Sequence, residues 1–414
     1  MDATLRLLAA LVIAAGACLT ASSRGHGASG VTLVVGFRAG TSAGAAASAI
    51  ERARAERAET LPDRRTVTAT VPAAAEAGTL ARLNADPAVA YAEPARVVTL
   101  DQTPIDPGFG DLASWAYELP GFPAAWDVTT GSSAVTVAVV DTGVNPVADL
   151  AGALVPGYDF VARDDDTADD NGHGTEVAGT IAARGDNGIG GAGACWSCRI
   201  MPVKVADAAG RALDADVAAG IEYAADHGAQ IVNVSLAGSE STEVLADAVA
   251  YAEAHGVLVV AAAGNEGSTQ VGYPAGYPGV LSVAGSDPGD ARYAWSSYGA
   301  WVDVTAPGCV ETTSSSGLAV TGCGTSFATP LTAGLAALLL SAKPGTTAGE
   351  LAQAIEDSAE PVAGGYVAHG RIDAAGALAA LGLTTAASPS EDASPRTTTG
   401  VHGRQGGPGR NPSR

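Results

Sequence analysis

The sequence predicts an α/β fold in which a doubly wound parallel sheet is preceded by a small α+β module. Two observations lead to this prediction. From about residue 112 to 382, short runs rich in Val and Ile alternate with amphipathic helical stretches, as expected of parallel strands buried on both faces. Hydrophobic residues make up 47% of the chain but aromatic residues only 5%, so Ala, Val, Leu and Ile must fill the core.

The predicted strands and helices of the larger region follow one another in order. Strands are expected at VTVAVVD, which ends at Asp141, and at CRIMPVKV, IVNVSL, VLVVAAA and VLSVAG. Helices are expected at DADVAAGIEYAADHG and TEVLADAVAYAEAHG, and in stretches that open at His173 and near Ser326. Ligands of open parallel sheets bind beyond the carboxyl ends of the strands, so polar residues there are candidate site residues.

Residues 30–100 predict the separate α+β module. Its elements are a strand at VTLVVGF, a charged helix at SAIERARAERAE, a strand at VTATVP, a helix near 75–85 and a last strand in AVAYAEPARVV. The following residues, 101–111, are rich in Pro, Gly and Asp and indicate an exposed linker.

The two ends of the chain differ in composition from the predicted domains. Arg6 and an apolar run from Leu7 to Leu19 predict a secretory signal over 1–27, and the run is short for a membrane span. Lipid attachment at Cys18 is not expected, because Ala15 stands where a lipoprotein signal has a branched apolar residue. The polar tail 384–414 has no apolar periodicity and is expected to be disordered. We therefore expect an extracellular monomer with no stable membrane span.

Charge is concentrated in the larger region. Residues 107–383 carry 8 basic and 32 acidic side chains, a net charge of −24. This pattern favours a solvated acidic surface and argues against nucleic acid as a partner, while bound cations or basic ligands remain alternatives.

Four cysteines follow the predicted signal: Cys195, Cys198, Cys309 and Cys323. An even number in an exported chain predicts disulfides, with three pairings available. The CWSC stretch alternatively fits redox chemistry or half a zinc site, but there is no second CxxC. We favour the two local bridges, 195–198 and 309–323.

Three polar residues stand where the predicted elements begin or end. Asp141 ends a strand, His173 opens a helix between two glycines, and Ser326 lies at the start of a long apolar helix. Each has an ordinary structural explanation, and for Ser326 it is capping of its helix. Thr325 is an equally good cap, which leaves Ser326 available for chemistry. A hydroxyl nucleophile needs a base, and the base needs an orienting carboxylate.

The blocks VAVVDTGV, NGHGTEVAGTIAA and GTSFATP resemble the three signature blocks of the subtilisin-like (subtilase) serine peptidases, and VVAAAGNEG resembles a fourth. Their order Asp, His, Ser is that of subtilisin. The resemblance covers about 112–382. The module, with DPAVAYAEP, resembles the inhibitory propeptide of these enzymes. The implied division is a propeptide over 28–105 and a subtilisin-like peptidase domain over 106–383.

The resemblance implies a secreted serine endopeptidase, made as an autoprocessed zymogen, that hydrolyses polypeptides through an acyl-enzyme. Ser326 would be the nucleophile, His173 the general base and Asp141 its orienting carboxylate, with Asn265 donating to the oxyanion. The propeptide would act as an inhibitor. Alternatives are an inactive binding protein on the subtilase fold, a membrane-anchored peptidase and a metallohydrolase.

The resemblance also implies substrate-binding residues. The edge that pairs with extended substrate would be Ser235, Leu236 and Ala237, with alanine where the family usually has glycine. Ala262, Ala263 and Gly264 would form a wall of the pocket for the residue before the cleaved bond. Two further departures, Glu176 in place of a second histidine and Phe327 after the nucleophile, leave the triad intact.

Calcium is the cofactor that the resemblance implies, in a structural role and without a catalytic metal. Asp149 and Asn187 are the candidate ligands, on loops whose oxygen donors suit Ca²⁺. The aspartate-rich loop 164–170 does not fit an EF-hand, and HExxH is absent at His173. We predict that its five aspartates are exposed and slightly raise the pKa of His173 or hold a weak cation.

Overall fold

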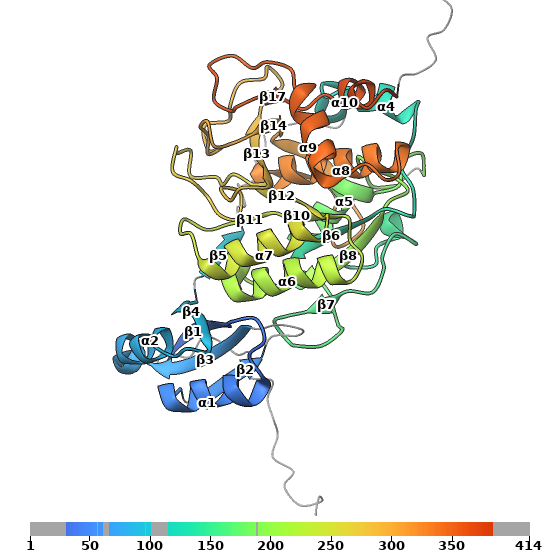
Figure 1. The fold of residues 1–414 in the computed structure, drawn as a ribbon. Helices are drawn as coiled ribbons and strands as arrows, with labels where there is room; N and C mark the ends of the chain where they lie inside the picture. Colours follow the sequence, from blue (N-terminus) through green and yellow to red (C-terminus); the bar gives the residue numbers. More distant parts are fainter. Residues whose placement is uncertain are drawn as a thin grey trace, which may run out of the picture.

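The structure, a computed structural model, describes residues 30–55, 57–60, 66–95, 97–100, 115–187 and 189–383. The predicted signal 1–27, with Cys18, the linker 101–111 and the tail 384–414 lie outside the described residues. A small N-terminal module lies beside a larger α/β domain (Figure 1).

The larger domain is built on an eight-stranded sheet in the order β17-β14-β13-β12-β10-β6-β8-β7, in which every pair of neighbours is parallel. The five predicted runs are confirmed as its central strands. These are β6 (Thr136–Asp141), β8 (Arg199–Lys204), β10 (Ile231–Val234), β12 (Leu258–Ala262) and β13 (Val280–Ser286). The outer strands are β7 (Tyr158–Asp159), β14 (Val304–Pro307) and β17 (Gly370–Arg371).

Helices cover both faces of this sheet, as the doubly wound prediction requires. Along β6, Val137 and Val139 face a core shared with α5 (His173–Ala182) and α8 (Thr325–Ala342). The alternate residues Ala138 and Val140 face a second core shared with α6 (Asp214–Asp226) and α7 (Glu243–Ala254). Successive residues of a strand point to opposite faces of the sheet, and here both faces are apolar. This is the property of buried parallel strands on which the fold-class prediction was based.

Shorter elements complete the larger domain. They are α3 (Trp115–Glu118), α4 (Phe122–Trp126), η2 (Ala148–Leu150), β9 (Arg211–Leu213), β11 (Leu236–Ala237), the hairpin β15 (Cys309–Thr313) and β16 (Ala319–Cys323), α9 (Ala348–Asp357) and α10 (Ala374–Ala380).

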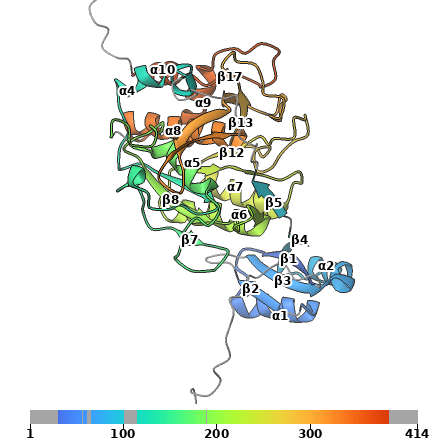
Figure 2. The same cartoon turned by 180° about the vertical axis from the view of Figure 1, so that it is seen from behind.

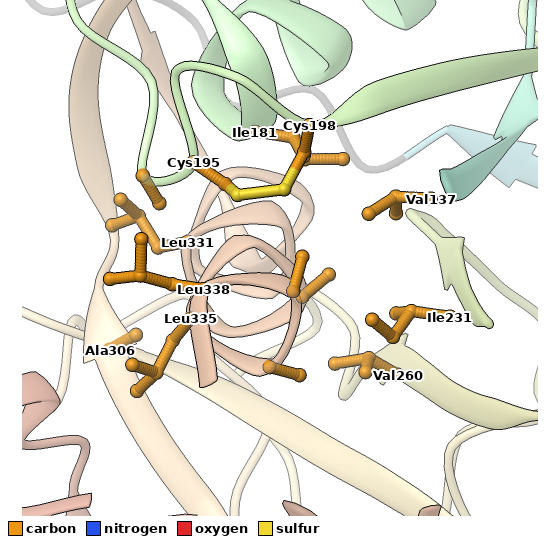
Figure 3. Close-up of a cluster of buried hydrophobic side chains, with 14 of the residues drawn as sticks. Val137, Ile181, Cys195, Cys198, Ile231, Val260, Ala306, Leu331, Leu335 and Leu338 are labelled. Carbon is orange, nitrogen blue, oxygen red and sulfur yellow. A yellow bond between two sulfur atoms is a disulfide. The ribbon is translucent and has the colours of Figure 1, made fainter. Parts of the chain in front are cut away.

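Helix α8 runs through the centre of the first core. Leu331, Leu335 and Leu338 point into a cluster with strand residues of the sheet (Figure 3). Within the described part of the chain, α8 is the one helix whose length and hydropathy would suit a membrane span, and 89% of it is buried in the domain. It is therefore the core helix of a folded domain.

Both favoured disulfides are present, Cys195–Cys198 and Cys309–Cys323. The first lies against the α8 core (Figure 3), and the second joins the paired strands β15 and β16. Cysteines joined in a disulfide are not available as zinc ligands, which removes the zinc alternative for CWSC, whereas a disulfide is itself one state of a redox CxxC pair.

The N-terminal module has an antiparallel sheet in the order β2-β3-β1-β4, with helices α1 and α2. Its elements are β1 (Gly30–Phe37), α1 (Ala43–Ala53), β2 (Arg57–Thr60), β3 (Thr66–Pro72), η1 (Ala73–Ala75), α2 (Glu76–Asn84) and β4 (Val89–Pro94). The predicted charged helix, 48–59, is displaced toward the C-terminus, because α1 begins at Ala43 and ends at Ala53 with Arg54 at φ 62°, and residues 57–60 pair with β3. Pairing across the sheet overrides the helical propensity of this charged stretch.

The end of the module leaves it and enters the larger domain. The predicted last strand divides into β4 and a separate strand β5 (Val97–Leu100), which pairs antiparallel with both β11 and β9. Glu93 accepts a hydrogen bond from the Val244 backbone N–H, at 3.1 Å, and so caps the N-terminus of α7. The module lies beside α6 and α7 in both views (Figures 1 and 2).

Candidate active site

Asp141 and His173 form a buried pair at the carboxyl end of β6. The His173 Nδ1 atom lies 2.8 Å from Asp141 Oδ1 and 3.0 Å from Oδ2, and both side chains are fully buried. A carboxylate in this position fixes the Nδ1–H tautomer of the imidazole. The other ring nitrogen, Nε2, is buried and has no hydrogen-bond partner among the described residues. The pair is therefore arranged as an oriented base.

The start of α5 places His173 against the end of β6. Gly172, with φ 113°, precedes the helix, a conformation that favours glycine. A side chain on Gly174 would bring its Cβ to 2.1 Å from the Gly143 carbonyl oxygen. The two glycines beside His173 thus permit a close approach of helix and strand end that larger residues would prevent.

The charge on Asp141 controls the pKa of His173. Burial acts to lower this pKa, but the Asp141 charge and hydrogen bond outweigh it, with smaller contributions from Glu176 and Asp169, and the net shift is upward. A raised pKa favours the imidazolium that forms when the base takes a proton.

The prediction that all five aspartates of the 164–170 loop are exposed is wrong for Asp169, which is 7% exposed. Its carboxylate accepts hydrogen bonds from the hydroxyls of Thr142 and Thr175, at 2.8 and 2.6 Å, and from the Gly172 and Thr175 backbone N–H groups. Thr142 Oγ1 in turn accepts from the Gly174 N–H. Asp169 therefore joins the turn after Asp141 to the first turn of α5.

A buried lysine reinforces the same region. Lys204, at the end of β8, is paired in register with Asp141. Its Nζ donates to the Thr142 carbonyl at 2.6 Å and to Asp170 Oδ1 at 2.7 Å. The turn after Asp141 and the loop before His173 are thus held by one side chain that is 4% exposed.

Ser326 lies in the first turn of α8 and is fully buried in this structure. Pro330, four residues later, has no N–H to donate to the Ser326 carbonyl. The Ser235 hydroxyl donates to that carbonyl instead, at 2.9 Å. The predicted substrate edge is therefore bonded directly to the backbone of the predicted nucleophile.

The expectation that Thr325 caps α8 through its side chain is wrong. Gly324 is the N-cap, and the Thr325 hydroxyl accepts from the Gly264 N–H and donates to Asn265 Oδ1. The Thr325 backbone N–H also donates to Asn265 Oδ1, at 2.9 Å. Two donors on the amide oxygen turn the Nδ2 group of Asn265 to the opposite side. Gly264, at φ 103°, supplies the turn on which this arrangement depends.

The predicted substrate residues lie on two strand ends. Leu236 and Ala237 form β11 and pair with β5, so that strand is already occupied by an extended segment. Ala262 ends β12, and the buried Ala263 belongs to an apolar cluster with Ala284 and Val302. The role of Ala262, Ala263 and Gly264 as a pocket wall remains a prediction.

Asp149 and Asn187 are brought together. Asp149 is fully buried, and the Asn187 Nδ2 atom donates to its Oδ1 at 2.6 Å. The other carboxylate oxygen accepts from the Gly191 N–H and the Thr313 hydroxyl. The two predicted ligands are thus in contact, and Asn187 lines a cavity of about 440 Å³ together with Glu118 and Glu311.

Glu176 lies one turn beyond His173, where the resemblance to subtilases implies a second histidine. Burial raises the pKa of Glu176 to about 7, against the lowering effect of His173. The pKa of Glu176 is higher in the folded protein than in the unfolded chain, so the unfolded chain ionises first as the pH rises. The folded protein therefore loses stability between about pH 4.5 and pH 7. Above pH 7 Glu176 is ionised in both states, and burial of its charge lowers the free energy of unfolding by the full amount.

We expect Glu176→Gln to stabilise the protein above pH 7 by on the order of 2–3 kcal/mol and to have little effect near pH 4. Unfolding of an inactive Ser326→Ala chain at both pH values measures this difference. Glu253→Gln, at an exposed position of α7, is the matched control. An equal effect of Glu176→Gln at both pH values would contradict the assigned cause.

Sequence reasoning missed the residues that support the candidate pair. No motif argument pointed to Thr142, Asp169 or Lys204. One signal was present: Lys204 is one of only two lysines in the chain and ends a predicted buried strand. A charged residue in that position needs partners nearby.

Comparison with known proteins identifies the family of this chain. Residues 132–406 match the subtilase family, Peptidase_S8. Thermitase of Thermoactinomyces vulgaris is 42% identical over 276 residues, which cover 66% of this chain and 98% of thermitase. A thermophilic serine proteinase of Bacillus sp. (strain AK1) is 42% identical over 301 residues, 72% of this chain and 74% of the relative. An alkaline protease of Shouchella clausii is 39% identical over 264 residues, 63% and 66% of the two chains. The chain belongs to the subtilase family and is a subtilisin-like serine endopeptidase.

Proposed function

We propose that Asp141, His173 and Ser326 are the catalytic triad of a secreted endopeptidase that is made as an autoprocessed zymogen. Ser326 Oγ attacks the scissile carbonyl, and His173 takes the proton and returns it to the leaving amine. Asp141 keeps the imidazole in the required tautomer and stabilises the imidazolium. The buried Asp141–His173 pair, with the second ring nitrogen left for another partner, carries this proposal.

Asn265 and the start of α8 supply the oxyanion site. The Nδ2 group of Asn265 and the Ser326 backbone N–H would donate to the oxygen that becomes negative in the tetrahedral intermediate. Because Thr325 already fixes the orientation of the amide, little reorganisation is needed during the reaction. The helix N-terminus adds a favourable dipole.

The substrate is an extended polypeptide that adds a strand between β11 and β9. Strand β5 occupies this place, with Leu100 opposite Leu236, Thr99 opposite Ala237 and Val98 opposite Ala212. Main-chain pairing on two sides binds a peptide with little regard to its side chains. This supports polypeptides as substrates and the module's own end as an occupant that blocks them.

The chain would be divided into a signal over 1–27, an inhibitory propeptide over 28–105, a peptidase domain over 106–383 and a polar tail over 384–414. The β5 register supports a cleavage close to Leu100. Leu100 lies opposite Leu236, whose neighbour Ser235 is bonded to the backbone of Ser326. We therefore place the processed bond between positions 101 and 106.

N-terminal sequencing of the protein recovered from the culture medium tests this division. We expect the mature chain to begin within 102–106 and the released module to inhibit the enzyme when added back. A mature chain that still contains β1, or one that begins after Trp115, would contradict the assignment of β5 as the inhibitory segment.

Calcium would be held at Asp149 and Asn187. The buried Asp149 carboxylate has only neutral partners among the described residues, Asn187, Gly191 and Thr313, so a cation would offset its charge. Oxygen ligands on loops suit Ca²⁺. Its role would be structural, because the site lies at the end of α5 away from His173.

We expect EDTA to lower the melting temperature of the mature enzyme while leaving its initial rate at low temperature unchanged. Added Ca²⁺ should restore the stability, and Asp149→Asn should remove the response to Ca²⁺. Immediate loss of activity with EDTA, reversed by zinc, would instead support a metallohydrolase.

An inactive binding protein on the same fold is the second candidate. No observation favours it, since all four predicted chemical residues are present and Asp141 and His173 are paired. We propose a monomer that is secreted, without lipid at Cys18, and that has no nucleic acid partner.

A further inference from the structure

Three potential metal ligands from separate elements converge outside the candidate active site. Asp303 directly precedes β14, Glu356 lies in the last turn of α9, and His369 directly precedes β17. Their ligand atoms all lie within 4.8 Å of one another, and His369 Nε2 is 3.9 Å from Glu356 Oε2. One imidazole and two carboxylates are therefore gathered in one place.

The backbone around these side chains orients two of them. Asp303 Oδ2 accepts hydrogen bonds from the Ser282 N–H at 2.9 Å and the Ser282 hydroxyl at 2.7 Å. The His369 backbone N–H donates to the Asp303 carbonyl at 2.9 Å. These bonds hold the Asp303 carboxylate in a fixed orientation. Such supporting bonds are typical of metal ligands.

The two carboxylates of this cluster favour binding of a cation. Among the described residues, neither Asp303 nor Glu356 forms an ion pair with a lysine or arginine; the nearby Arg371 pairs with Asp290. Two carboxylates thus converge on one imidazole with no lysine or arginine of the described part of the chain paired to either of them. A divalent ion would neutralise both.

We propose that Asp303, Glu356 and His369 bind a divalent transition metal ion of the zinc class. The imidazole nitrogen selects for Zn²⁺, Co²⁺ or Ni²⁺ over Ca²⁺, which takes oxygen ligands. The side chains of His369 and Glu356 are 37% and 21% exposed, which leaves room for water to complete the coordination. This ion differs in ligands and in place from the calcium proposed at Asp149.

The position of the site predicts what the ion does. In a parallel sheet, the residues that precede β14 and β17 lie at the amino ends of the strands, whereas Asp141 lies at the carboxyl end of β6. The metal would join α9 to the amino ends of the outer strands β14 and β17. We infer a stabilising clamp that takes no part in peptide hydrolysis.

Titration of Zn²⁺ into the full-length Ser326→Ala chain, in buffer saturated with Ca²⁺, tests the proposal without self-digestion. Calorimetry should detect a site that is about tenfold or more weaker in His369→Ala and in Glu356→Gln. Zinc in excess should raise the melting temperature of the parent by about 5 °C and leave both variants unchanged. His255→Ala, an exposed histidine at the end of α7, is the matched control.

Cobalt provides a second readout that a purely structural role of His369 would not change. Co²⁺ should give a visible absorption band in the parent and in His255→Ala that is absent from His369→Ala and Glu356→Gln. Glu356→Gln keeps the side-chain shape, so the test remains decisive if His369→Ala fails to fold. Equal zinc affinity in the parent and in either ligand variant, or no binding by the parent, would overturn the proposal.

Discussion

Replacing Ser326 with alanine is expected to abolish peptide hydrolysis and to leave the exported chain as a precursor that keeps residues 30–100. The loss of turnover should be about 10⁶-fold, the size found when the nucleophile is removed from a subtilisin. The alanine lacks the oxygen proposed to attack the carbonyl, while the Asp141–His173 pair and the proposed oxyanion site remain. Gel mobility and intact mass of the purified protein, with a peptide hydrolysis assay, measure both effects.

The control for this variant is Ser316→Ala, at an exposed position of the β15–β16 hairpin. It should be processed and active like the parent. Trace amounts of active enzyme added to Ser326→Ala show whether the precursor can be cut by a second molecule. A pure Ser326→Ala preparation that still loses the module would contradict self-cleavage by Ser326.

Replacing Asn265 with alanine is expected to lower kcat by about 10²–10³ with little change in KM, the loss measured when the equivalent amide is removed from subtilisin. The amide would contact the oxygen only after it becomes negative, so the transition state is affected more than the bound substrate. Steady-state kinetics on a peptide substrate measures the two parameters separately.

Asn265→Asp separates donation to the oxyanion from the anchoring of the loop. Aspartate retains an oxygen that accepts from the Thr325 N–H and hydroxyl but has no N–H to donate. It should therefore fold with nearly the parent's melting temperature and lose kcat as severely as Asn265→Ala. An Asn265→Asp enzyme with near-normal kcat would contradict the oxyanion role.

The parts of the fold that follow local patterns were predicted well from the sequence. The central strands, including β6 with its end at Asp141, have apolar residues on both faces, and this pattern depends on the strand alone. The disulfides are between cysteines near in sequence. Asp149 and Asn187 were also predicted as a pair, although the ion they would hold remains a proposal.

The failures share a physical cause, since each depends on contacts between distant segments. Strand β5 was assigned to the module, but its partners, β11 and β9, lie more than a hundred residues further along the chain. The α1 helix was extended into residues that pair with β3. Thr325 was expected to cap its own helix, but its hydroxyl is bonded to Asn265.

At the candidate site, the burial of Asp169 also depends on contacts that local sequence patterns do not reveal. In the sequence it is one of five aspartates in a polar loop, and composition predicts that such a loop is exposed. In the structure five donors from Thr142, Asn171, Gly172 and Thr175 converge on it. A pattern of residues along one loop does not indicate which member turns inward.

Reaction with a serine-directed phosphonylating reagent tests the central claim, the triad of Asp141, His173 and Ser326, most directly. Mass mapping of the labelled mature enzyme should find one modification, on Ser326, that appears as hydrolysis is lost. His173→Ala should react far more slowly, because no base accepts the serine proton. Complete loss of hydrolysis with Ser326 unmodified, or full activity with Ser326 labelled, would contradict it.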